Sequence, residues 1–268
     1  MISPVGSHMD ANIRRIFDLE GKVALVTGGG SGLGRGIAEG LAAFGAAVSV
    51  VDVHLAGAEE ALGEFRRHGS KGLALACDVT DSGQVRRAVA DTVDRLGRID
   101  ILAAVAGIAD RNPAEQMTEE QWDRVVEVNL KGVWLFDQEV GRHMITRGGG
   151  GSIINMASIV GQVGVLTGNA NYAASKGGVI ALTRLLAIEW ARFNIRVNAI
   201  APVQFRTPLV TSLIERKPET LDYFLAQIPL GRLGEVWEIV GPAVFLASSA
   251  SSMVTGTVLN VDGGHTAR

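Results

Sequence analysis

The chain has 268 residues, of which 47% are hydrophobic, with a formal net charge of −3 and one cysteine, Cys77. This length is enough to bury one sizeable core, and the slightly acidic charge provides no basic face for nucleic acid. No apolar run reaches the ~20 residues of a membrane span, and a single cysteine excludes an intrachain disulfide framework. We therefore expect a soluble cytoplasmic protein with no nucleic-acid partner and no membrane partner.

The first residues differ in character from the remainder of the chain. Gly6–Met9 reads GSHM, which is typical of the remnant of a cleaved affinity tag. We expect residues 1–9 to be a cloning tag remnant and residues 10–268 to form a single domain.

From residue 22 onward, short apolar segments alternate with amphipathic ones. The expected strands are Lys22–Thr27, Ala46–Asp52, Lys71–Cys77, Ile99–Ala106, Ser152–Met156, Ile195–Ile200 and Thr257–Val261. The expected helices are Gly32–Phe44, Leu55–His68, Ser82–Leu96, a long region between Thr118 and Met144, Tyr172–Arg192 and Glu235–Ala247. This alternation predicts an α/β fold, a single Rossmann-like doubly wound domain with a seven-stranded parallel sheet flanked by helices on both faces. Ligands of such sheets lie across the carboxyl ends of the strands.

A glycine-rich segment follows the first expected strand and opens the first expected helix. It reads TGGGSGLG, and its candidate cofactor contacts are Gly28, Ser31, Gly32, Leu33 and Gly34. Glycine lets the backbone approach a pyrophosphate, while a helix N-terminus offers free N–H groups and a positive dipole end. Tight turns also use glycine, but the position directly after the first strand favours dinucleotide binding.

Acidic residues end the next two strands. Asp52 can accept hydrogen bonds from the adenosine ribose hydroxyls and would repel a 2′-phosphate, so we predict NAD as the cofactor, with NADP disfavoured. Asp78 and Val79 are candidates for framing the adenine, although an aspartate here is equally suited to begin a helix.

The segment NYAASK places Tyr172 four residues before Lys176. On a helix these side chains share one face. An ammonium ~6 Å from the phenol, at an effective dielectric constant of ~20, favours the phenolate by roughly 3 kcal/mol. A second cation, such as an oxidised nicotinamide, would lower the phenol's pKa further towards neutral pH. The spacing alone is a weak indication, because a tyrosine and a lysine on a partly exposed helix are commoner than a catalytic pair.

Two other polar residues stand at informative places. Ser158 lies just past the fifth expected strand, from which its hydroxyl can hold a carbonyl oxygen in the same cleft. Asn129 lies in an expected helix, where asparagine has poor propensity, and a structural hydrogen bond to a neighbouring backbone would also explain it. No histidine has a spacing typical of a triad or a metal site, so we expect no metal.

Together these motifs resemble the short-chain dehydrogenase/reductase family over residues 20–264, including Val261–Gly264 (VDGG). The resemblance implies hydride transfer between C4 of a nicotinamide and a secondary alcohol or ketone. It makes Tyr172 the general acid/base, and Ser158 the residue that positions the substrate oxygen. Lys176 would bind the nicotinamide ribose and lower the tyrosine's pKa, while Asn129 would anchor a water in a proton relay.

The resemblance also implies further cofactor contacts, and this chain departs from the family next to two of them. The contacts are Ala106, Gly107, Tyr172, Lys176, Pro202 and Thr207, the last of which matches the residue that contacts the nicotinamide carboxamide. The family's Asn-Asn-Ala-Gly is AVAG here, so we expect weaker support of the cofactor edge around Val105. The family's Pro-Gly after the sixth strand is Pro-Val, which adds the branched side chain of Val203 beside the nicotinamide.

Residues 203–230 are expected to form a substrate lid, in which Arg206 is a candidate to clamp a carboxylate. The C-terminal half resembles the gluconate and 2-deoxygluconate dehydrogenase branch, which implies a sugar acid or polyol as substrate and a role in carbohydrate metabolism. A 3-oxoacyl-thioester reductase is an alternative, although it normally uses NADP. A catalytically silent dinucleotide-binding sensor or scaffold is an alternative of another class. Apolar side chains on the two long helices, as in similar proteins, imply a homotetramer.

Overall fold

The structure is a computed structural model that describes residues 13–67, 69–165 and 168–267. The expected tag remnant at residues 1–9 lies outside the described residues, as does His68, where we expected the second helix to end. None of the described helices is both long and apolar enough to cross a membrane.

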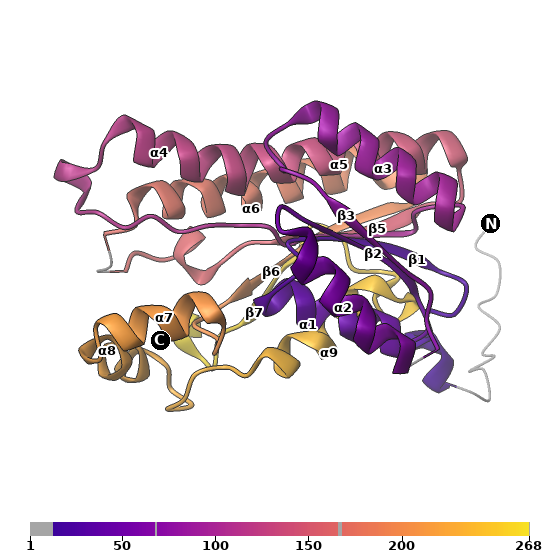
Figure 1. The fold of residues 1–268 in the computed structure, drawn as a ribbon. Coiled ribbons are helices and arrows are strands. Elements are labelled where there is room, and N and C mark those ends of the chain that lie inside the picture. Colours follow the sequence, from indigo (N-terminus) through magenta and orange to yellow (C-terminus); the bar gives the residue numbers. More distant parts are fainter. Residues whose placement is uncertain (1–12, 68, 166–167, 268) are drawn as a thin grey trace, which may run out of the picture.

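Seven parallel strands form one sheet in the order β3-β2-β1-β4-β5-β6-β7, which confirms the predicted fold class (Figure 1). The strands are β1 (Val23–Thr27), β2 (Ala47–Asp52), β3 (Gly72–Ala76), β4 (Ile101–Ala104), β5 (Gly151–Met156), β6 (Ile195–Pro202) and β7 (Val258–Val261). The chain moves from β1 to one edge through β2 and β3, then crosses back to β4 on the other side of β1. The carboxyl ends of β1 and β4 therefore flank the point where strand order reverses, which is where such sheets bind ligands.

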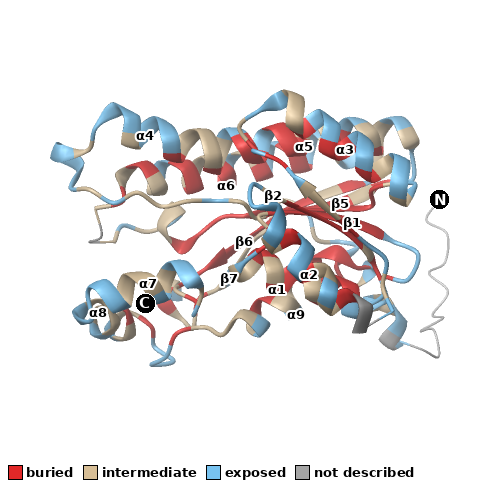
Figure 2. Cartoon of the chain, viewed as in Figure 1, coloured by how far each residue is buried: buried red, intermediate tan, exposed pale blue. Residues whose placement is uncertain are grey.

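Helices cover both faces of the sheet (Figure 1). One layer holds α3 (Ser82–Leu96), α4 (Glu119–Val126), α5 (Gly132–Arg147) and α6 (Ala170–Trp190). The other holds α1 (Gly32–Ala43), α2 (Leu55–Arg67), α7 (Pro208–Arg216), α8 (Glu219–Gln227) and α9 (Val240–Ala247). Figure 2 shows the buried residues concentrated in the sheet and on the helix sides that face it. All five residues of β1 are buried, because a central parallel strand is covered on both faces.

The long helical region expected between Thr118 and Met144 is divided into two helices. Thr118 begins α4 through a capping box with Gln121. A π turn at Glu127–Lys131 then separates α4 from α5. Turns of this kind inside α-helices are frequent at functional sites.

Candidate active site

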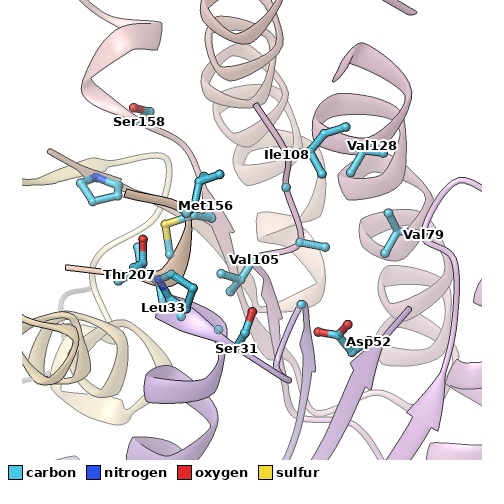
Figure 3. A pocket seen from close by; sticks show the side chains of 18 of the residues that line it. Ser31, Leu33, Asp52, Val79, Val105, Ile108, Val128, Met156, Ser158 and Thr207 are labelled. Atoms are coloured by element: carbon cyan, nitrogen blue, oxygen red, sulfur yellow. The ribbon is translucent and has the colours of Figure 1, made fainter. Parts of the chain in front are cut away.

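A cleft of about 530 Å³ opens at the carboxyl ends of the strands. Small-molecule sites typically have volumes of this order. Every predicted site residue except Asn129 lines it. Figure 3 shows Asp52 and Ser158 on opposite sides of the group of lining side chains. Ile108, Val128 and Met156 also line the cleft, and the prediction missed them although each lies within two residues of a motif residue.

The glycine-rich loop is folded tightly against itself and against the loop after β4. Gly28 has a φ of +64°, and a Cβ on it would lie 2.7 Å from the Cα of Ala106. A Cβ on Gly34 would lie 2.1 Å from the carbonyl oxygen of Gly28. Only glycine fits these two positions, and their backbones therefore border the cleft directly.

The start of α1 carries groups that suit a phosphate. Ser31 is the N-cap residue, but its side chain makes no capping hydrogen bond and the residue is exposed. The first N–H groups of a helix have no acceptor within the helix. A free hydroxyl and free N–H groups at one helix N-terminus fit the pyrophosphate of a dinucleotide.

Asp52 ends β2 at the rim of the cleft. One carboxylate oxygen accepts a hydrogen bond from the Gly30 N–H at 3.0 Å, and the other accepts one from the His54 N–H at 2.9 Å. A carboxylate has about four acceptor positions, so Asp52 can still accept from ribose hydroxyls. The hydrogen bond from Gly30 fixes Asp52 beside the backbone of the glycine-rich loop.

Asp78 and Val79 line the neighbouring wall after β3. Asp78 does not begin α3, because Asp81 is the N-cap residue and accepts from the N–H groups of Gly83 and Gln84. The Asp78 carboxylate instead accepts from the Thr80 N–H at 2.9 Å, which shapes the turn. The helix-start alternative for Asp78 is therefore wrong, and Val79 provides the apolar surface beside it (Figure 3).

The hydroxyl of Thr27 supports the loop after β4, where we expected weaker support around Val105. Its Oγ1 accepts hydrogen bonds from the backbone N–H groups of Val105 at 3.0 Å and Ala106 at 3.2 Å. These two residues therefore leave the sheet, and β4 ends at Ala104 instead of Ala106. Hydrogen bonds therefore join the end of β1 to the loop after β4, although this chain lacks the family's asparagine amides at Ala104 and Val105.

Asn129 lies in the π turn and is completely buried. Its Oδ1 accepts from the Ile108 N–H at 2.8 Å, and its Nδ2 donates to the Ile108 carbonyl at 2.9 Å. A weaker contact of 3.4 Å joins Nδ2 to the hydroxyl of Ser175. The two bonds to Ile108 agree with the explanation that the sequence left open, in which Asn129 forms a structural hydrogen bond to a neighbouring backbone.

Tyr172 and Lys176 share one face of α6, as their spacing predicts. The Lys176 Nζ lies 5.7 Å from the centre of the Tyr172 ring and donates a hydrogen bond to the Met156 carbonyl at 2.7 Å. Burial lowers the pKa of Lys176 to about 8. Burial also raises the pKa of the Tyr172 phenol, and the Ser158 hydroxyl and the positive charge of Arg111 oppose that rise. We expected charged groups of the chain to lower the pKa of the Tyr172 phenol. That prediction is wrong, because desolvation raises this pKa by more than the chain's own groups lower it.

Ser158 sits just beyond β5 and is 6% exposed. It is the N-cap residue of the short 3₁₀ turn Ile159–Gly161, and its Oγ accepts from the Val160 N–H at 3.3 Å. The hydroxyl hydrogen remains available for a second partner. Ser158 and Tyr172 therefore meet at the same end of the cleft, opposite Asp52.

The segment after β6 forms the remaining wall. Pro202, Val203 and Thr207 all line the cleft, and Val203 is 9% exposed. The Thr207 hydroxyl caps α7, and both α7 and α8 lie within residues 203–230, the segment expected to form a lid. Arg206, the candidate clamp for a substrate carboxylate, forms an ion pair with Glu235 instead. Its Nε lies 2.9 Å from a carboxylate oxygen of Glu235.

Nowhere in the described ranges do three or more histidine, cysteine, aspartate or glutamate side chains form a cluster that could hold a metal ion.

Comparisons with known proteins agree with this geometry. The family profile described as "Enoyl-(Acyl carrier protein) reductase" matches residues 28–266. The 2-dehydro-3-deoxy-D-gluconate 5-dehydrogenase of Dickeya dadantii is 42% identical over 260 residues, which cover 96% of this chain and 100% of the relative. The 3-oxoacyl-(acyl-carrier-protein) reductase of Thermotoga maritima is 43% identical over 246 residues, covering 92% of this chain and 98% of the relative.

A solved structure of a similar protein extends the agreement to three dimensions. The gluconate 5-dehydrogenase of Burkholderia cenocepacia, crystallised with NADP and tartrate, matches with a TM-score of 0.89 and 40% identity. The match covers 94% of this chain and 98% of that one. One conclusion follows from the matched profile, the sequence identities and the cleft at the point where strand order reverses. The chain belongs to the short-chain dehydrogenase/reductase family of oxidoreductases, which bind a nicotinamide dinucleotide.

Proposed function

We propose that this protein is an NAD-dependent oxidoreductase that transfers a hydride between the nicotinamide and a secondary alcohol or ketone. The observation that carries the proposal is the Tyr172–Lys176 pair, with Nζ 5.7 Å from the ring centre, at the cleft end opposite Asp52. The substrate we propose is a sugar acid or a polyol. The names of the Dickeya and Burkholderia relatives, both acting on gluconate derivatives, support that choice.

In this mechanism Tyr172 exchanges a proton with the substrate oxygen while Ser158 holds that oxygen by a hydrogen bond. Lys176 holds the nicotinamide ribose and favours the phenolate through its charge. Asn129, behind the loop at Ile108, would anchor a water in the proton relay. A bound oxidised nicotinamide supplies the hydride acceptor at C4 and a second positive charge. Because burial raises the pKa of the Tyr172 phenol, the charges that Tyr172 meets during the reaction must offset that rise.

The preference for NAD rests on the adenosine end of the cleft. Asp52 presents a carboxylate there, and neither Val53 nor Ser31 is an arginine that would receive a 2′-phosphate. The NADP bound to the Burkholderia relative is an argument for the other cofactor, so a direct comparison of the two is needed.

Two alternatives compete with this proposal. A 3-oxoacyl-thioester reductase is favoured by the identity with the Thermotoga enzyme. A silent dinucleotide-binding sensor or scaffold is disfavoured because Asn129, Ser158, Tyr172 and Lys176 are all intact. A scaffold has no use for a hydroxyl, a phenol and an ammonium gathered at one end of a cleft.

We further propose that residues 203–230 act as a substrate lid and that the protein is a cytoplasmic homotetramer. A buried free thiol at Cys77 is compatible with a reducing compartment. For assembly, Trp134 and Leu185 are 41% and 56% exposed on α5 and α6. Leu135 and Phe136, which lie on the same helix as Trp134, are instead buried in this chain's own core. Size-exclusion chromatography with light scattering tests the assembly.

Absorbance at 340 nm with NAD or NADP tests the activity on a panel of sugar acids, polyols, cyclic alcohols and 3-oxoacyl thioesters. We expect reduction of NAD with a sugar acid or polyol, and a loss of at least about 1,000-fold in kcat for Tyr172→Phe, because the proton acceptor is gone. Cofactor binding without turnover of any compound, together with no effect of Tyr172→Phe, would overturn the enzyme proposal.

A further inference from the structure

Val203, the first residue after β6, has no role in the mechanism above. Its side chain lines the cleft at the position where the family's Pro-Gly has no side chain. We infer that Val203 limits the size of one of the two carbon groups on the reacting carbon, so that the enzyme acts on a secondary hydroxyl next to the end of a carbon chain. This inference rests on the proposed function, to which it adds the position of the hydroxyl in the substrate.

Val203 lies close to the hydroxyl that is proposed to hold the substrate oxygen. β5 and β6 pair in parallel, and Met156 lies opposite Ile200 in the last pair of the two strands. Ser158 continues from β5 with an extended backbone, at a φ of −164°. Two residues beyond Ile200 on β6 is Pro202, the residue before Val203, and neighbouring strands are only about 4.8 Å apart. Ser158, Pro202 and Val203 therefore line adjoining parts of the cleft wall.

The side chain of Val203 is held firmly in this wall. Val203 is 9% exposed, and its N–H donates to the Val261 carbonyl at 3.2 Å. It belongs to the buried core cluster that also contains Met156 and Ile159. A branched side chain has little freedom about its first torsion. Val203 is therefore a rigid part of the wall, unlike Leu209 on α7, which also lines the cleft but is 55% exposed.

The side chain, and not the backbone, distinguishes this position from a glycine. Among the described residues, Asn194 is the one residue other than glycine that has a positive φ, so Val203 has an ordinary backbone conformation. The path of the chain therefore does not require glycine here. A glycine would leave the space of the valine side chain open to the cleft, whereas in this protein that space is filled.

The reacting carbon of a secondary alcohol carries an oxygen, a hydrogen and two carbon groups. In the proposed mechanism Ser158 and Tyr172 fix the direction of the oxygen, and the hydrogen must point to C4 of the nicotinamide. The two carbon groups then have fixed directions, and one of them lies on the side of β6. A methyl or hydroxymethyl group fits beside Val203, whereas a longer group meets its branched side chain. A polyol or sugar acid would thus react at the carbon next to an end of its chain.

The kinetic test compares 2,3-butanediol with 3,4-hexanediol, two uncharged diols in which the reacting carbon carries a methyl or an ethyl group. In the parent protein we expect kcat/KM for butanediol to exceed that for hexanediol by at least about 10-fold, the usual effect of one carbon in a closely packed pocket. Val203→Gly should reduce this ratio to about two, and Val203→Ala, which disturbs the fold less, should give an intermediate value. Val203→Thr keeps the branched shape and should keep the ratio of the parent protein. Val93→Ala is the matched control, because it shortens a partly buried valine on α3 outside the cleft lining, and should leave the ratio unchanged.

The position of the carbonyl in the product gives a second measurement. With sorbitol as the probe, carbon NMR of the product shows which hydroxyl was oxidised. We expect the parent protein to form the carbonyl at C2 or C5, next to a chain end, and Val203→Gly to form it at C3 or C4 as well. A loss of stability alone would lower the rate without changing this position. The same mixture of products from both proteins would overturn the inference.

A binding test separates this inference from the proposed function. Ligand-observed NMR titration of the two diols into the NAD complex of Tyr172→Phe measures their affinities without turnover. A preference for butanediol that Val203→Gly removes supports the inference, even if the parent protein oxidised nothing. Equal affinities without a change at Val203, or a preference that only Leu209→Ala removes, would overturn it. A raised KM for NAD with an unchanged ratio of the diols would also overturn it, since Val203 would then act on the cofactor.

Discussion

The side-chain amide of Asn129 binds both backbone polar groups of Ile108, accepting from its N–H at 2.8 Å and donating to its carbonyl at 2.9 Å. The contact joins the π turn between α4 and α5 to the loop that leaves β4. Since Ile108 lines the cleft, a residue that does not itself line it still controls the cleft's shape.

Asn129→Leu should therefore reduce both stability and cofactor affinity. It leaves the partly buried N–H and carbonyl of Ile108 without their partner, and an unpaired buried group costs at most about 1–3 kcal/mol. We expect a lower urea midpoint and a KM for NAD raised several-fold. Asn129→Asp keeps the acceptor for the Ile108 N–H and should retain more affinity than the leucine variant. If both variants bind NAD as the parent protein does, Ile108 does not depend on Asn129.

Lys176 should make the stability of the protein depend on pH in a particular direction. Burial lowers the pKa of the folded lysine to about 8 from its ordinary 10.5. Between those two pH values the unfolded chain holds more protons than the folded one, so stability rises with pH. Lys176→Met lacks this dependence. Its free energy of unfolding minus that of the parent protein should therefore fall by up to about 3 kcal/mol from pH 7.5 to pH 10.

Urea denaturation at the two pH values, without added cofactor, measures this difference. Lys131→Met is the control, because Lys131 is an exposed lysine with a Glu127 partner at 2.6 Å. A constant difference between Lys176→Met and the parent protein would mean that the buried lysine stays charged in the folded protein over this range.

Asp52→Asn should weaken the preference for NAD. The amide oxygen can still accept from the Gly30 N–H, while the charge that repels a 2′-phosphate is removed. We expect the ratio of kcat/KM for NADP to that for NAD to rise by about 10-fold. Adding Val53→Arg, at a position that is 61% exposed, should raise it further by providing a cation. A ratio that stays within twofold in both variants would show that the adenosine end is not selected by charge.

Asp137 should destabilise the protein increasingly as the pH rises. It is completely buried and accepts one hydrogen bond, from Asn155 Nδ2 at 3.0 Å, while its other oxygen has no partner within the described residues. Burial raises the pKa of Asp137 from 3.8 to about 8. Between these values the folded chain holds more protons than the unfolded one, so stability falls as pH rises.

Asp137→Asn mimics the protonated form, so its advantage over the parent protein should grow with pH. The expected growth is up to about 1.4 kcal/mol per pH unit between pH 5 and pH 8. Urea denaturation at several pH values measures it, with the exposed Asp91→Asn as control. An advantage that does not change with pH would mean that Asp137 is ionised in the folded protein over this whole range.

The strands and the glycine-rich loop could be predicted from the sequence because their causes are local. Apolar runs such as the one at Val23–Thr27 become buried strands wherever both faces of a sheet are covered. The Tyr172–Lys176 spacing fixes a shared helix face, and the structure has both side chains there.

Other features of the site depend on contacts between distant residues. The support that Thr27 gives to Val105 joins residues 78 positions apart, and no periodicity in the sequence reports it. The π turn at Asn129 is likewise absent from the hydrophobic pattern, which reads as one long helix. The net direction of the Tyr172 pKa was also out of reach, because it depends on burial by the whole fold.

The π turn has a consequence for the register of the following helix. Each residue of an α-helix turns the chain by about 100°, so a turn that contains one extra residue rotates everything after it by that amount. Behind this turn lies the 16-residue helix α5, on which Phe136 is 1% exposed and Trp134 is 41% exposed. Removing one residue from Glu127–Lys131 would not merely shorten the connection, because it would turn Phe136 out of the core. The position of Asn129 and the orientation of α5 therefore cannot vary separately.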